Sequence, residues 1–224
     1  MGSNVSDKPG KRLGRPPRTD NQRERILREA AVLFAQSGFE ESRLSDLAQG
    51  TGISKAGIYH YFRSKQDVYD AIIVQTLQRL VEYVGAVVEG AQGPRAQLLA
   101  FMTAHAEFFE HNYWAFCAML IGFSGMRRRE MRQEAVDLRE RYEHLLRAIV
   151  AEGVARGEFR AVDAAMTGRA VLSMLNWMAR WFHPGGPKTA PEFARVYVDL
   201  LLGGLLQEPN LSGGPPTLRA CPGV

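Results

Sequence analysis

The stretch Leu44–Lys65, which reads LSDLAQGTGISKAGIYHYFRSK, specifies the fold of the N-terminal part of the chain. Its apolar residues fall where two short helices that cross at a wide angle must touch: Leu47, Ala48, Ile53, Ile58 and Phe62. Ala48 is small enough for a close approach of the helices. Gly52 suits the left-handed turn between them because it lacks a Cβ. We therefore predict a helix-turn-helix over this stretch.

The second helix of the pair carries polar and aromatic side chains on its outer side: Ser54, Lys55, Gly57, Tyr59, His60 and Tyr61. Such a helix can enter a DNA groove, and the missing side chain of Gly57 would let DNA approach the backbone. We expect Phe62 in the core. We expect Tyr59 and His60 to point outward, because three adjacent aromatic rings on so short a helix cannot all be buried. Burial of Tyr59 in the core is the alternative.

Positive charge is concentrated in the first third of the chain. The formal net charge is +4, and residues 1–65 hold 12 Lys and Arg against 7 Asp and Glu. In residues 1–18 basic side chains alternate with Gly and Pro, which predicts a flexible arm: Lys11, Arg12, Arg15 and Arg18. The arm could neutralise phosphates or lie in an A·T-rich minor groove. A solubilising tail or part of an expression leader is the alternative.

The whole chain reads at helical period, so the predicted fold class is all-α with about nine helices. A capping box at Thr19–Gln22 opens the first helix, Gly38 ends it, and Ser42, Ser54 and Ser64 are expected to cap the next three. The predicted organisation is an arm (1–18), a three-helix helix-turn-helix domain (19–65), a larger helical domain for ligand binding and dimerisation (66–207) and a disordered tail (208–224). The helix over 66–90 would connect the domains. Further helices are expected over 94–111, 113–123, 127–155, 163–182 and 191–206.

Composition excludes several classes of protein. With 46% hydrophobic and 23% charged residues, the chain is neither collagen-like nor wholly disordered. No apolar run is long enough to span a membrane, the N-terminus does not resemble a secretory signal, and two distant cysteines predict a reducing compartment. We therefore expect a cytoplasmic protein with no membrane partner.

The residues of an enzyme or metal site are not gathered anywhere along the sequence. No strand is expected, so no glycine-rich phosphate loop follows one. The 5 histidines are scattered, and no Cys/His quartet has zinc-ligand spacing. We expect no catalytic residue, no metal and no cofactor.

The predicted helix over 163–182 is apolar nearly all round, with polar exceptions on one stripe: Arg169, Ser173, Asn176 and Arg180. The stripe faces either solvent or another chain, or it forms a pocket wall. Aromatic and Met residues of the preceding helices suit an adaptable apolar pocket, and the arginine run at 127–129 suits a phosphate. The candidate effector contacts are His105, Phe109, Tyr113, Met119, Phe123, Arg127, Arg128, Ser173, Asn176, Trp177 and Arg180.

The run Tyr59–Lys65 resembles the end of the signature of the TetR family of bacterial repressors, and the resemblance covers about residues 20–70. It implies a homodimer that binds double-stranded DNA at a palindromic operator, and a C-terminal domain that binds a small inducer. Carried over by position, it implies base-edge contacts for Lys55, Ala56, Gly57, Tyr59 and His60. It implies phosphate contacts for Tyr61 and Lys65, and a base or backbone contact for Ser45. Arg43 stands where the family usually has a small hydroxyl residue, which puts the local cap in doubt, although Arg43 could add a phosphate contact.

The segment Asn176–Pro187 resembles the C-terminal region of TetR-type regulators of lipid, sterol and aromatic-acid catabolism. This resemblance implies an acyl-CoA thioester as effector, and pairing of the last two helices with those of a second copy. The expected function is thus that of a ligand-responsive, sequence-specific repressor. We expect it in the cytoplasm, associated with the nucleoid. The alternative is a ligand-independent or architectural DNA-binding protein that prefers A·T-rich DNA. The sequence does not distinguish a repressor from an activator.

Overall fold

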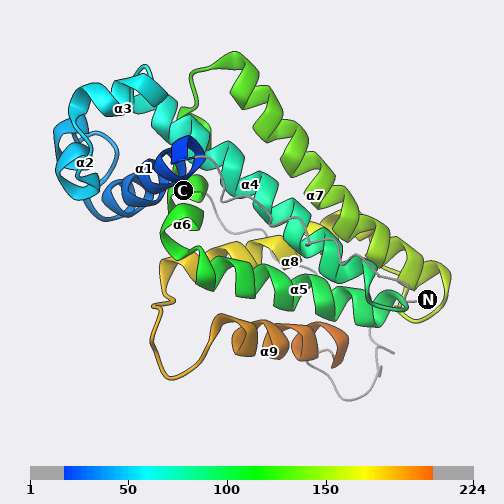
Figure 1. Cartoon of the computed structure of the whole chain (residues 1–224). Coiled ribbons are helices and arrows are strands. Elements are labelled where there is room, and N and C mark those ends of the chain that lie inside the picture. The colour runs from blue at the N-terminus through cyan, green and yellow to red at the C-terminus, as the bar shows by residue number, and fades with distance from the viewer. Residues whose placement is uncertain (1–17, 204–224) are drawn as a thin grey trace, which may run out of the picture. The chain divides into compact units, whose positions relative to one another are not determined.

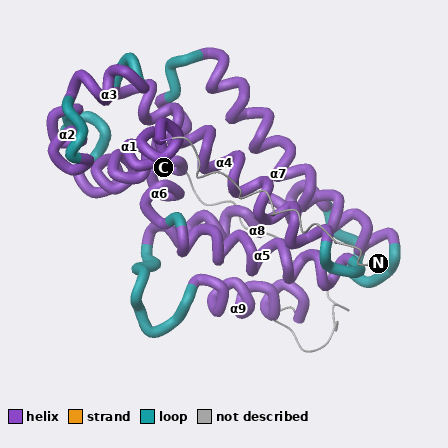
Figure 2. The backbone as a smooth tube through the Cα atoms, viewed as in Figure 1, coloured by secondary structure: helices purple, strands orange, loops and turns teal. Residues whose placement is uncertain are grey.

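The computed structural model describes residues 18–203, and every regular element among them is a helix, joined by loops (Figures 1 and 2). The elements are α1 (Arg18–Ser37), α2 (Leu44–Thr51), α3 (Lys55–Tyr61), α4 (Lys65–Glu89), α5 (Pro94–His111), α6 (Tyr113–Gly122), α7 (Arg129–Ala155), α8 (Ala164–Trp177) and α9 (Ala190–Gly203), with short 3₁₀ helices η1 (Phe123–Gly125) and η2 (Met178–Arg180). The all-α prediction with about nine helices is confirmed for these residues. Most of the predicted arm and the tail at 208–224 lie outside them.

Two of the three caps predicted for α2, α3 and α4 are confirmed, whereas α1 begins at Arg18, one residue before the predicted cap Thr19. Ser54 accepts a hydrogen bond from the backbone N–H of Gly57 (3.1 Å), and Ser64 accepts one from that of Asp67 (3.0 Å). The prediction for Ser42 is wrong, because its hydroxyl donates backward to the carbonyl of Gly38 (2.5 Å). Arg43 occupies the N-cap position of α2 instead.

The chain divides into two compact units, and the boundary between them falls inside α4. The first unit spans Met1–Thr76 together with Trp114–Ala135, so α6 and the start of α7 pack with the helix-turn-helix. The periodicity of the sequence predicts that second segment as part of the larger domain over 66–207. Long-range packing brings it to the N-terminal unit, and local periodicity carries no information on such packing.

Tyr69 of α4 is the centre of the first unit. Its ring packs against Phe34 (centroids 5.2 Å apart) and Phe39 (4.8 Å). Its hydroxyl donates to the carbonyl of Ala118 in α6 (3.1 Å), and a Cβ on Gly122 would overlap its ring. One buried side chain therefore joins the end of α1, the start of α4 and the face of α6.

The second unit, Leu77–Tyr113 with Val136–Val224, is built around α5, which packs along α9. Its core holds aromatic pairs such as Phe109 and Phe182 (centroids 5.4 Å apart) and Trp181 and Phe193 (4.9 Å). Edge-to-face contacts of this kind add to the stabilisation by buried area. The apolar faces predicted for these helices thus form one core.

α4 is the one helix among the described residues whose length and mean hydropathy would suffice to cross a membrane. Half of its most apolar window is buried inside the protein. Asp70 lies on this helix and is fully buried. The core helix of a globular protein gives the same pattern.

Candidate nucleic-acid interface

The turn between α2 and α3 is fixed by two residues. Gly52 ends α2 with a φ of 64°, the left-handed conformation expected from the sequence. Thr51 is fully buried, and its hydroxyl donates to the carbonyl of Leu47 (2.7 Å) while accepting from the N–H of Ile53 (3.3 Å). These contacts hold the two helices at a set angle.

Gly57 is required by the fold as well as suited to DNA approach. A Cβ at this position would lie 2.7 Å from Cγ2 of Ile53 and 3.3 Å from the capping hydroxyl of Ser54. Both distances are shorter than normal van der Waals contact. The first turn of α3 can therefore pack on the turn residue Ile53 only without a side chain here.

α3 presents one exposed face. Lys55, Ala56, Tyr59 and His60 are all exposed, and their spacing places them on one side of the helix. Tyr59 is 47% exposed, whereas Ile58 is 0% and Phe62 5% exposed. The structure thus brings the predicted base-contacting residues together, and it places Phe62 in the core as expected.

Asp46 caps the start of α2 through its side chain. Its carboxylate accepts a hydrogen bond from the backbone N–H of Arg43 (2.9 Å), so the acidic partner of the cap is present although the small hydroxyl residue is not. The Arg43 side chain makes no cap hydrogen bond and is exposed, as is Ser45. Both side chains are accessible to a DNA backbone.

Lys65, for which a phosphate contact is predicted, makes hydrogen bonds within the unit. Its ammonium donates to the carbonyls of Phe39 (2.5 Å) and Ser42 (2.9 Å), with a third, longer bond to Glu40 (3.3 Å). It also lies 4.2 Å from the centre of the Phe39 ring. An ammonium has three protons to donate, so all are directed at the loop between α1 and α2.

Tyr61 is likewise engaged within the unit. Its hydroxyl donates to Oε1 of Gln22 in the first turns of α1 (2.8 Å). A phenol has one proton to donate, so a phosphate at Tyr61 must displace Gln22.

Two arginines of α1 that the sequence analysis did not single out lie close to the helix-turn-helix. A Cβ on Gly52 would come within 3.9 Å of Nη2 of Arg25, and Arg23 lies 5.3 Å from the ring centre of Phe62. Both are exposed cations. They lie two residues apart and therefore on different sides of α1, so no periodic pattern in the sequence marks them.

The predicted arm is largely outside the described residues. Lys11, Arg12 and Arg15 lie there, and Arg18 is the first residue of α1.

The first turn of α4 is bonded to the loop before α7. Asp70 is fully buried and accepts from the side-chain amide of Gln66 (2.7 Å) and from the backbone N–H of Arg128 (3.4 Å). The Arg128 guanidinium lies 3.5 Å from Asp67, which also accepts from the backbone N–H of Arg63 (3.2 Å). The segment that follows α3 and the segment that precedes α7 thus share one carboxylate.

The candidate effector contacts are spread over both units. In the first, Met119 of α6 is buried and Phe123 of η1 half-buried, while Arg127 and Arg128 are exposed. In the second, Phe109 is fully buried and the Tyr113 hydroxyl donates to the carbonyl of Phe182 (3.1 Å).

His105 forms a buried polar pair with Tyr142. Its Nδ1 lies 2.8 Å from the Tyr142 hydroxyl, and the Tyr142 ring packs against Phe101 (centroids 4.8 Å apart). Burial lowers the pKa of His105 from 6.5 to about 3 and raises the pKa of Tyr142 well above 10. Both groups are therefore neutral at physiological pH, which lets them share a hydrogen bond in an apolar core.

The polar stripe of α8 lies on the exposed side of the unit. Ser173, Trp177 and Arg180 are exposed and Asn176 is half-buried. Trp177 is 63% exposed, and the Arg180 guanidinium lies 5.7 Å from its ring centre. Of the two interpretations of this stripe, a face toward solvent or another chain agrees with this placement.

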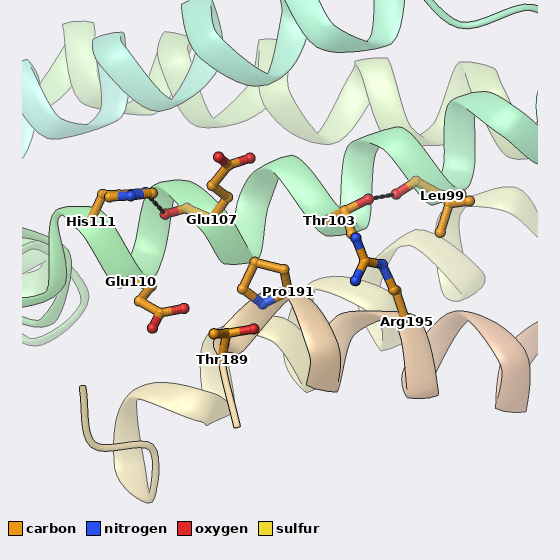
Figure 3. A pocket seen from close by; sticks show the side chains of 8 residues that line it. All are labelled: Leu99, Thr103, Glu107, Glu110, His111, Thr189, Pro191 and Arg195. Atoms are coloured by element: carbon orange, nitrogen blue, oxygen red, sulfur yellow. Dashed lines mark hydrogen bonds between the residues drawn. The ribbon is translucent and has the colours of Figure 1, made fainter. Parts of the chain in front are cut away.

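A groove of about 460 Å³ runs between α5 and α9 (Figure 3). It is lined by Leu99, Thr103, Glu107, Glu110, His111, Thr189, Pro191 and Arg195. Glu110 accepts from the backbone N–H of Ala190 (2.8 Å), and Nδ1 of His111 lies 2.9 Å from the carbonyl of Glu107. Six of the eight lining residues are polar or charged, and none of them is a candidate effector contact. Among the described residues no group of three His, Cys, Asp or Glu side chains is placed to hold a metal ion.

Comparisons with known proteins agree with this geometry. Residues 26–72 match the family model described as bacterial regulatory proteins, tetR family, and residues 91–205 match the model described as tetracyclin repressor-like, C-terminal domain. The transcriptional repressor KstR2 of Mycolicibacterium smegmatis is 27% identical over 197 residues, covering 86% of this chain and 94% of the relative.

Solved structures share the fold. That of the TetR family regulator PfmR from Thermus thermophilus has a TM-score of 0.77 at 48% sequence identity, covering 81% of this chain and 99% of PfmR. That of AibR in complex with isovaleryl coenzyme A and operator DNA has a TM-score of 0.71 at 23% identity, covering 80% and 97% of the two chains. With a helix-turn-helix capped and packed as described above and family matches over both parts, the chain belongs to the TetR family of DNA-binding transcriptional regulators.

Proposed function

We propose that this regulator is a homodimeric repressor that binds a palindromic operator and is released by a small effector of the acyl-CoA class. The exposed face of α3, with Lys55, Ala56, Tyr59 and His60 on a capped and tightly packed helix, carries the proposal. A dimer of such domains would place two recognition helices about one DNA turn apart, roughly 34–36 Å. A DNA-binding regulator works where the DNA is, so we assign it to the bacterial cytoplasm.

Selection of random duplexes by the pure protein at moderate salt, followed by sequencing, tests operator recognition. We expect enrichment of an inverted repeat. Enrichment of A·T-rich DNA alone would overturn this part of the proposal in favour of a ligand-independent architectural protein.

Tyr59 offers the sharpest test of base recognition. Tyr59→Ala should weaken operator binding about 10- to 100-fold, in line with the 1–3 kcal/mol of a specific base contact. Binding to unrelated duplexes should change little, since that term depends on phosphates. Tyr83→Ala is the matched control, because Tyr83 is 37% exposed but lies in the second unit. Equal losses in the two variants would contradict the assignment.

The dimer part rests on exposed apolar side chains of α8 and α9. Met166 is 61%, Trp177 63%, Val196 48% and Leu200 48% exposed. Val196 and Leu200 are four residues apart and therefore share a face of α9. Large exposed apolar side chains that share a helix face favour an interaction site.

Substitution on α9 tests the interface. Val196→Asp should shift the protein from dimer to monomer in sedimentation equilibrium and reduce operator affinity. Val87→Asp, at a 39% exposed position of α4, should leave the dimer intact. A Val196→Asp protein that stays dimeric would refute the assignment of this face.

The proposal of an acyl-CoA effector rests on the apolar, aromatic second unit and on the fold shared with AibR. AibR was solved in complex with isovaleryl coenzyme A and operator DNA. We retain His105, Phe109 and Tyr113 as candidate contacts. α4 belongs to both units, so a tilt of this helix would change the spacing of the recognition helices. An effector releases DNA only by its preference for the state that cannot bind it.

Calorimetric titration with medium-chain, long-chain and ring-bearing acyl-CoAs tests the effector class, with free coenzyme A as control. We expect heat of binding from at least one thioester, and loss of operator binding in its presence. Absence of heat from all of them would refute the acyl-CoA class and leave DNA recognition untouched.

A further inference from the structure

Four arginines at the start of α7 belong to the same structural unit as the helix-turn-helix: Arg127, Arg128, Arg129 and Arg132. All four are exposed. The Arg128 guanidinium pairs with Asp67, and the Arg128 backbone N–H donates to Asp70. Among the described residues, no carboxylate lies within ion-pair distance of the other three guanidinium groups.

The segment that carries these arginines contacts residues close to the end of the recognition helix. Asp67 contacts the Arg128 guanidinium at 3.5 Å and the backbone N–H of Arg63 at 3.2 Å, and Arg63 directly follows the C-cap of α3. Gln66 also donates to the carbonyl of Gly125 (3.4 Å). The loop before α7 therefore lies against the first turns of α4, which directly follow α3, and α3 and the start of α7 both lie in the upper part of Figure 1.

Helix stability does not account for this cluster. Cations in the first turn of a helix oppose its dipole, at a cost of roughly 0.3–1 kcal/mol each when exposed. Only two acidic residues, Glu130 and Glu134, accompany the four arginines over 127–134, so the segment keeps a net charge of +2. Its excess positive charge is therefore available to an anionic partner.

We propose that Arg127, Arg129 and Arg132 contact DNA backbone phosphates adjacent to those reached by α3. The contacts are independent of base sequence, so they orient the reading unit and add affinity without adding specificity. The proposal rests on the operator binding proposed above. It assigns the arginine run to DNA, where the resemblance to acyl-CoA-responsive regulators suggested an effector phosphate.

The salt dependence of DNA binding tests the proposal. Each phosphate contact contributes about 0.9 to the slope of log K against log salt concentration. In R127Q/R129Q/R132Q the slope should fall by up to about 2.7 per protomer on the operator and on an unrelated duplex alike. The triple variant R127K/R129K/R132K keeps the charge and should keep the slope.

The matched control is R95Q/R141Q/R160Q, which removes three exposed arginines of the second unit. It makes the same change in net charge and should leave the slope unchanged to within one contact. An unchanged slope in R127Q/R129Q/R132Q overturns the proposal. If that variant instead loses acyl-CoA binding, measured by calorimetry, the cluster serves an effector. Failure of the unsubstituted protein to bind any duplex would refute the proposed function itself.

Discussion

Replacing His105 by Gln should flatten the acid side of the pH–stability profile. Burial lowers the pKa of His105 from 6.5 to about 3 in the folded protein. Between these values the unfolded chain binds a proton that the folded chain does not, so stability is lost as the pH falls from 6.5 toward 3. Tyr142, the hydrogen-bond partner, stays neutral throughout because its pKa is raised.

The magnitude follows from the width of this window. Each pH unit below 6.5 removes about 1.36 kcal/mol from the free energy of unfolding. At pH 4.5 the loss from this one group is about 3 kcal/mol. Gln does not titrate, and its side chain can still accept a hydrogen bond from Tyr142. The difference in stability between the native protein and His105→Gln should therefore shrink by about 3 kcal/mol between pH 7.5 and pH 4.5.

Urea unfolding at one protomer concentration, repeated at each pH, measures this difference. His144→Gln is the control, because His144 is exposed on α7 and has no comparable burial. It should follow the native profile. If the free energies of unfolding of the native protein and of His105→Gln change with pH in parallel, to within about 0.5 kcal/mol, the reasoning is refuted. That margin is the accuracy to which ΔΔG values of independent effects add.

Three further substitutions test the N-terminal unit. Lys65→Met should lower the free energy of unfolding by about 1–3 kcal/mol, because it leaves carbonyls of the loop without their charged donor; weaker DNA binding at unchanged stability would contradict this. Gly122→Ala should cost about 1–3 kcal/mol in thermal unfolding, since its Cβ overlaps the ring of Tyr69, whereas Gly125→Ala meets open space. Ser54→Ala should cost about 1 kcal/mol through loss of the cap of α3, and unchanged stability would show that the cap is dispensable.

The resemblance of Tyr59–Lys65 to the TetR signature predicted the exposure of side chains on α3 but not their hydrogen-bond partners. It predicted which residues face outward on α3, because exposure on a short helix follows from its period. It did not predict that Tyr61 and Lys65 are hydrogen-bonded within the unit. A motif records residue types, and these residues can donate equally well to a carbonyl, an amide oxygen or a phosphate.

Local sequence was enough to predict the helices, the helix-turn-helix and the family. These depend on residues within a few positions of one another: apolar period, capping hydroxyls, and a glycine where φ must be positive. The hydrogen-bond and ion-pair partners of the charged side chains could be identified only in the tertiary structure. The Lys65 ammonium reaches carbonyls 23 to 26 residues away, and Arg128 reaches Asp67 and Asp70 across about 60 residues. Such contacts depend on the packing of whole helices, and local patterns do not encode that packing.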